Sequence, residues 1–60
     1  MPVAMVYVPE GALTKDQRRD IIKGIHEVIN RVEKRPPDAQ TYVVVTEVAA
    51  GHWGNAGNVH

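Results

Sequence analysis

Residues 14–34 read TKDQRRDIIKGIHEVINRVEK, and this stretch predicts one long amphipathic helix. Thr14 and Gln17 have the spacing of a capping box, in which each side chain bonds the backbone N–H of the other residue. The apolar residues recur at three- and four-residue intervals and form one stripe: Ile21, Ile25, Val28 and Val32, widened by Ile22 and Ile29. Pro36-Pro37 forbids continuation, so we expect the helix to end by about Lys34.

A strand is predicted on each side of this helix. Val3–Val8 is largely apolar on both of its faces, which indicates that both faces are covered. Residues 41–48 are dense in β-branched residues and predict a second strand. Two strands joined by a long helix favour a parallel, right-handed βαβ unit. The turn-rich segment 51–57, GHWGNAG, predicts a short hairpin or loop. We therefore expect an α+β fold, with residues 1–60 in a single domain.

The chain is small enough that it should need partners. It has 60 residues, and a chain of this size buries only about 60% of its unfolded surface. A sheet of two strands is not stable by itself. The chain has no cysteine, which excludes disulfides, and its three histidines lack the spacing of a metal motif. We expect oligomerisation to supply the missing stability, so that any pocket lies between chains.

The charge balance argues against several classes of partner. Seven Lys and Arg residues match seven Asp and Glu residues, for a formal net charge of 0. No strong field therefore favours nucleic acid or an anionic membrane. No apolar run approaches the roughly 20 residues of a membrane span, and no secretory signal is visible. We expect a cytoplasmic protein that acts on a small molecule.

Pro2 follows the initial methionine directly and opens the first strand. Methionine is commonly trimmed before so small a residue, which would leave proline as a free secondary amine. A free α-amino group titrates near pH 8 (about 7.7–8.0), and burial among apolar groups lowers that pKa. Such an amine is suited to act as a general base or nucleophile near neutral pH. The alternative is that proline is merely tolerated at the first residue of a strand, where no ladder donor is needed.

Several short motifs follow one another in a distinctive order. They are Met1-Pro2, the apolar strand, Glu10-Gly11, the capped helix, Thr46-Glu47-Val48 and the segment 51–57. In order, spacing and total length they resemble the 4-oxalocrotonate tautomerase family. This resemblance implies the tautomerase/MIF-like fold, in which small βαβ subunits assemble as a homohexamer, a trimer of dimers. It also implies that Pro2 shuttles a proton during keto–enol tautomerisation, with no metal or organic cofactor.

The chain departs from the best-known members of that family at two positions. Those members carry an arginine just after the Glu-Gly loop and another near the start of the second strand, and both grip substrate carboxylates. Ala12 and Tyr42 stand at these positions here, and the loop around residues 34–37 is longer by two residues. Because neither side chain replaces a bidentate guanidinium, 2-hydroxymuconate is not the expected substrate. The general prediction of a proline-based tautomerase does not depend on these arginines.

Three other side chains are candidates for binding substrate. Tyr42 would donate a hydrogen bond to a developing enolate, or else pack on the sheet. Arg35 would reach a neighbouring pocket from the helix–strand loop, or else remain a solvated loop charge. Trp53 matches the aromatic wall of the family's active site, and it also suits an interface anchor, since tryptophan is enriched at interface cores.

We therefore predict a cofactor-independent isomerase that uses Pro2 to move a proton on a small enol or unsaturated carbonyl acid. Two alternatives remain. The chain could be a non-catalytic βαβ oligomer or a small-metabolite-binding protein. It could also be one subunit of a hetero-oligomeric tautomerase whose partner supplies the missing arginines.

Overall fold

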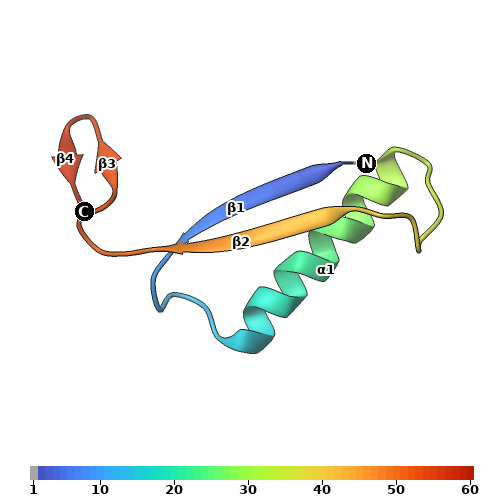
Figure 1. Ribbon diagram of the computed structural model, residues 1–60, viewed down its shortest axis with the longest axis horizontal. Coiled ribbons are helices and arrows are strands. Elements are labelled where there is room, and N and C mark those ends of the chain that lie inside the picture. Colours follow the sequence, from blue (N-terminus) through green and yellow to red (C-terminus); the bar gives the residue numbers. More distant parts are fainter. Residues whose placement is uncertain (1) are drawn as a thin grey trace.

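The computed structural model describes residues 2–60, which form one βαβ unit followed by a small hairpin (Figure 1). The elements are β1 (Val3–Pro9), α1 (Lys15–Val32), β2 (Tyr42–Val48), β3 (Gly54–Asn55) and β4 (Asn58–Val59). The predicted α+β class and the predicted order of strand, helix and strand are confirmed, and the turn-rich tail is a hairpin. The predicted removal of Met1 concerns a residue outside the described range.

Helix α1 begins at the capping box that the sequence predicts. The hydroxyl of Thr14 accepts a hydrogen bond from the Gln17 backbone N–H at 3.1 Å, and the Gln17 side chain accepts one from the Thr14 backbone N–H at 2.9 Å. The helix ends at Val32, because Lys34 adopts a left-handed conformation with φ of 57° ahead of the two prolines. Within residues 2–60, no helix combines the length and the apolar character needed to cross a membrane.

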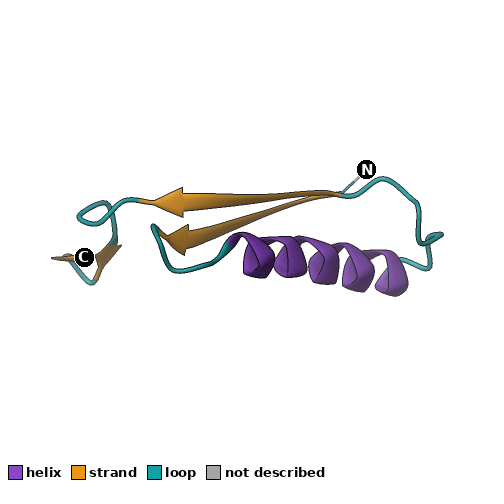
Figure 2. Cartoon of the chain, turned by 90° about the horizontal axis from the view of Figure 1, so that it is seen from below, coloured by secondary structure: helices purple, strands orange, loops and turns teal. Residues whose placement is uncertain are grey.

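Strands β1 and β2 pair in parallel, as predicted, with Val3 opposite Tyr42 and Pro9 opposite Val48. Helix α1 lies against one face of this pair (Figure 2). The helix-facing strand residues, half-buried except for the exposed Glu47, are Ala4, Val6, Val8, Val43, Val45 and Glu47. The parallel crossover therefore brings the C-terminal end of α1 to the same end of the sheet as the start of β1.

The predicted apolar stripe of α1 is only partly the stripe that packs on the sheet. Ile21, Ile25 and Ile29 are half-buried, whereas Val28 and Val32 are 47% and 71% exposed. A sheet of only two strands contacts the helix along a single row of residues that are four apart in sequence. Val28 and Val32 are not in this row, so they lie beyond the edge of the sheet. The apolar side chains of Val28 and Val32 are therefore left for some other contact.

No apolar side chain among residues 2–60 is fully buried. The sheet face away from α1 carries a continuous apolar patch, which we call the open sheet face: Val3, Met5, Tyr7, Tyr42 and Val44, each between 44% and 62% exposed. A patch of this kind on so small a chain is typical of a protein–protein interface. The sequence prediction that both strand faces are covered thus requires something beyond this one chain.

We predict that Met5→Lys prevents the oligomerisation that the sequence leads us to expect. Met5 lies opposite Val44 in the middle of the open sheet face, and an unpaired ammonium in an apolar interface costs several kcal/mol. Sedimentation velocity should show a shift from an oligomer to monomer or unfolded chain. The matched control is Ala12→Lys, which adds the same charge to the exposed loop after β1. An oligomer that survives Met5→Lys intact would mean that this face is not an interface.

Candidate active site

Pro2 lies directly before β1, at the end of the sheet where α1 ends. Its carbonyl oxygen accepts a hydrogen bond from the Tyr42 backbone N–H at 3.0 Å, which ties this end of the chain to β2. Pro2 is half-buried and lines a hollow of about 370 Å³ that we call the Pro2 hollow; the other lining residues are Val28, Ile29, Val32 and Glu33. Pro2 is thus held against an aliphatic wall made by the last turns of α1.

A buried asparagine, Asn30, supports this end of the sheet. Asn30 is 2% exposed. Its side-chain NH₂ group donates to the carbonyl oxygens of Pro36 and Ala39, both at 3.2 Å, and its Oδ1 accepts from the Thr41 hydroxyl at 2.7 Å. His26 Nε2 donates to a further loop carbonyl, that of Pro37, at 2.8 Å. These bonds tie the loop after α1 to the helix.

Asn30 is a structural support of this end of the sheet that was not predicted from the sequence. Two signals were present: a polar residue directly after Ile29 on a helix with an apolar stripe, and its place one turn before a loop with two prolines. Proline has no backbone N–H, so a loop with two prolines has fewer hydrogen-bond donors than acceptors. Some of its carbonyl oxygens therefore need a partner from elsewhere. Neither signal by itself indicates which carbonyls the side chain meets.

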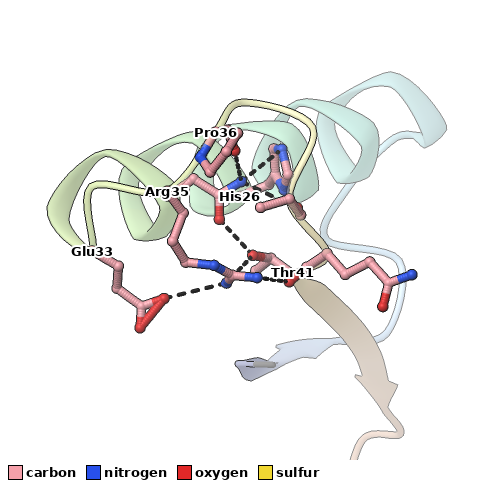
Figure 3. Close-up of polar contacts among 8 residues, drawn as sticks. His26, Glu33, Arg35, Pro36 and Thr41 are labelled. Atoms are coloured by element: carbon pink, nitrogen blue, oxygen red, sulfur yellow. Dashed lines mark hydrogen bonds and ion pairs between the residues drawn. The ribbon is translucent and has the colours of Figure 1, made fainter.

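The structure gives the predicted site residue Arg35 a role within the loop (Figure 3). Its guanidinium donates to Glu33 Oε1 at 3.3 Å, to Thr41 Oγ1 at 3.3 Å and to the Gln40 carbonyl at 2.7 Å. Arg35 does not line the Pro2 hollow. It lines a separate hollow of about 450 Å³ with His26, Glu27, Asn30, Arg31 and Pro37. Three of its five N–H donors are thus engaged, and its predicted contact with substrate stays a prediction.

Tyr42 lies beside Pro2 along the backbone but points to the other face of the sheet. Its side chain is 53% exposed on the open sheet face, opposite Val3. Successive side chains of a strand point to opposite faces, so Tyr42 and the Pro2 hollow are separated by the sheet within one chain. A contact between the Tyr42 hydroxyl and a substrate at Pro2 would have to involve two copies.

Trp53 lies at the opposite end of the sheet from Pro2, between β2 and the hairpin (Figure 1). It is half-buried, and its backbone exchanges hydrogen bonds with His60 at 3.1 and 2.9 Å. It lines a hollow of about 370 Å³ that we call the Trp53 hollow, together with Pro9, Glu10, Val48, Ala50 and His60. Seven strand residues span about 20 Å, so Pro2 and Trp53 cannot share a site within one chain.

One ion pair joins the helix to the second strand, away from both hollows. Arg18 Nη1 lies 2.8 Å from Glu47 Oε1 and links α1 to β2, at partial exposure where such a pair contributes only about 0–1 kcal/mol. In the part of the chain that the structure describes, no three His, Asp or Glu side chains gather closely enough to hold a metal ion.

The chain resembles known proteins in both sequence and structure. A family model described as "Tautomerase enzyme" matches residues 2–60. A 4-oxalocrotonate tautomerase isozyme from Methylibium petroleiphilum is 26% identical, with a TM-score of 0.83 over 97% of this chain and 90% of that one. The apo form of unFused 4-OT is 27% identical, with a TM-score of 0.85 over 98% and 93%. No curated protein sequence matches the chain.

A third similar structure bears on the fold alone. It is a 4-oxalocrotonate tautomerase homologue that is 24% identical to this chain, with a TM-score of 0.81 over 98% of this chain and 90% of that one. All three structures extend over nearly the whole chain, so the likeness includes the hairpin as well as the βαβ unit.

Proposed function

Because this chain belongs to the tautomerase family, with the fold of the 4-oxalocrotonate tautomerases, we propose that it moves a proton between the oxygen and carbon atoms of a small substrate with Pro2 as general base. Family membership supports an isomerase of the tautomerase type. The substrate we propose is a small enol or unsaturated carbonyl acid. The observation that carries the proposal is the position of Pro2, anchored to β2 through its carbonyl and set against the aliphatic wall of α1.

The proposed chemistry needs only the nitrogen of Pro2. Removal of Met1 converts that nitrogen from an amide into a secondary amine. The neutral amine takes a proton from an enol hydroxyl, or from carbon next to a carbonyl, and returns it to a different carbon of the same molecule. The aliphatic wall favours the neutral amine by desolvation, whereas the Glu33 carboxylate at the same hollow favours the protonated amine. A positioned base contributes about 10²–10⁴-fold, and the remaining acceleration comes from orientation and from stabilising the enolate.

We propose that the working unit is a homo-oligomer, a hexamer built as a trimer of dimers, that acts in the cytoplasm. The exposed apolar residues of the open sheet face support association. The separation of Pro2 from Trp53 and Tyr42 within one chain supports a site shared between copies. In that site Tyr42 donates to the enolate oxygen, Trp53 forms an aromatic wall, and Arg35 contacts the substrate through its two remaining donors.

A pH profile and an intact mass test the proposal together. We expect the purified chain to lack Met1 and to ketonise phenylenolpyruvate. Its kcat/KM should rise with pH as the amine loses its proton, because only the neutral form accepts one. Retention of Met1 in material from the native host, or turnover that is flat with pH, would contradict the proposal.

A second candidate is a non-catalytic oligomer that binds a small metabolite. It is favoured by Ala12 and Tyr42, which stand where the resemblance leads us to expect carboxylate-binding arginines. This candidate predicts tight assembly without turnover. The remaining alternative is a hetero-oligomer whose partner supplies the arginines. In that case the purified chain would be inactive until the partner is added.

A further inference from the structure

The Pro2 hollow has an unusual lining for a site that handles an acid. Three of its side chains, Val28, Ile29 and Val32, are aliphatic, and among residues 2–60 the one ionisable side chain in the lining is that of Glu33. No Lys, Arg or His among residues 2–60 of the same chain contributes to this lining. The hollow is thus apolar with one negative group.

We propose that the Pro2 hollow takes an uncharged, apolar part of the substrate and that Glu33 excludes a second carboxylate from it. The preferred substrate class is an enol acid with a single carboxylate and a hydrocarbon or aromatic remainder, in place of a dicarboxylate. This inference rests on the function proposed above and narrows its substrate.

The aliphatic wall provides the first argument. Val28 and Val32 belong to the apolar stripe of α1 but do not pack on the sheet, and they are 47% and 71% exposed. Burying their apolar surface away from water would lower the free energy of the system. The volume of about 370 Å³ is within the range of small-molecule sites, which begins near 300 Å³. A flat hydrocarbon or phenyl group held beside the nitrogen of Pro2 would provide that cover.

The charge around the hollow provides the second argument. Glu33 is the C-cap residue of α1, so its carboxylate lies at the end of the helix where the macrodipole is negative. Both features repel an anion. One oxygen of Glu33 lies 3.3 Å from Arg35 Nη1, which offsets part of its charge. That guanidinium is also bound to Thr41 and Gln40 and lines the other hollow, so it offers no fork to a second carboxylate at the Pro2 of its own chain.

The test compares kcat/KM for a monoacid, phenylenolpyruvate, with kcat/KM for a dicarboxylate, 2-hydroxymuconate. We expect the wild-type chain to prefer the monoacid by at least about tenfold, the effect of a like charge met at close range in a partly dry site. Glu33→Gln should shift the ratio toward the diacid by about three- to tenfold, and Glu33→Lys should shift it further. Both changes are at an exposed helix cap, with a side chain 46% exposed, where folding tolerates them.

The matched control is Asp20→Asn. Asp20 is a carboxylate on the same helix, also paired with an arginine, at 3.6 Å, but far along the chain from the hollow. Its substitution should leave the ratio of the two substrates unchanged.

The outcomes separate this inference from the proposed function. A wild-type chain that prefers the diacid overturns the inference, and so does a Glu33→Gln ratio equal to that of Asp20→Asn. Either of these two results leaves the proposed role of Pro2 intact, provided that Pro2→Ala turns over neither the monoacid nor the diacid. If the assembled wild-type chain turns over neither substrate, the proposed function and the inference both fail.

Discussion

Replacing Pro2 by alanine should lower kcat/KM for ketonisation by about 10²-fold or more, which is the usual contribution of a positioned general base. Alanine retains an α-amino group, now a primary amine, but loses the ring that fixes the direction of the nitrogen lone pair and fills the space against Val28, Ile29 and Val32. The nitrogen is then free to turn away from the substrate, and the advantage of orientation is lost. Steady-state rates with phenylenolpyruvate measure the effect.

The design keeps the fold separate from the chemistry. The hydrogen bond from the Tyr42 N–H to residue 2 uses a backbone carbonyl, which alanine retains. Sedimentation velocity and circular dichroism should therefore match the wild type. The control is Pro37→Ala, which makes the same substitution at an exposed loop position. Undiminished turnover by a correctly assembled Pro2→Ala chain would remove Pro2 from the mechanism.

Replacing Asn30 by alanine should lower the free energy of unfolding by about 2–3 kcal/mol. The change removes three hydrogen bonds and leaves the Thr41 hydroxyl and the carbonyls of Pro36 and Ala39 without the partner they have in the wild type. A loss of this size is a large fraction of the 5–15 kcal/mol that stabilises a typical domain. Urea unfolding at one fixed protein concentration measures it, because assembly makes stability depend on concentration.

Two further variants make this second result specific. Asn30→Asp retains an acceptor for Thr41 but turns an oxygen toward the Pro36 and Ala39 carbonyls, so it should be at least as damaging as alanine. Glu27→Ala changes an exposed residue of the same helix and should stay within about 0.5 kcal/mol of the wild type. If Asn30→Ala were as stable as Glu27→Ala, the asparagine would not be the support of this loop.

The Asn30 bonds also link stability to the proposed chemistry. They hold Thr41, and Thr41 precedes the residue whose backbone N–H binds the Pro2 carbonyl. A loosened loop would let the first residue of β2 move away from Pro2. We therefore expect Asn30→Ala to raise KM as well as to weaken the fold.

The order and the ends of the elements followed from the sequence by itself. The Thr14–Gln17 pair and the two prolines after α1 act on their own neighbours, so the start and the approximate end of the helix needed no tertiary information. The same is true of the parallel pairing, because a long helix between two apolar strands leaves few other arrangements. The exposed apolar face also followed, since 60 residues in this pattern cannot cover both sides of a sheet.

Only the tertiary structure decided what surrounds Pro2. The rotation of α1 about its axis depends on packing against two narrow strands, and it left Val28 and Val32 beside Pro2 instead of on the sheet. The path of the loop determines which carbonyl oxygens Asn30 binds. It also directs Arg35 to Thr41 and Gln40 and away from the Pro2 hollow. These contacts join residues up to about 30 positions apart in sequence. Whether two such side chains meet depends on how the whole chain packs and not on the neighbouring sequence.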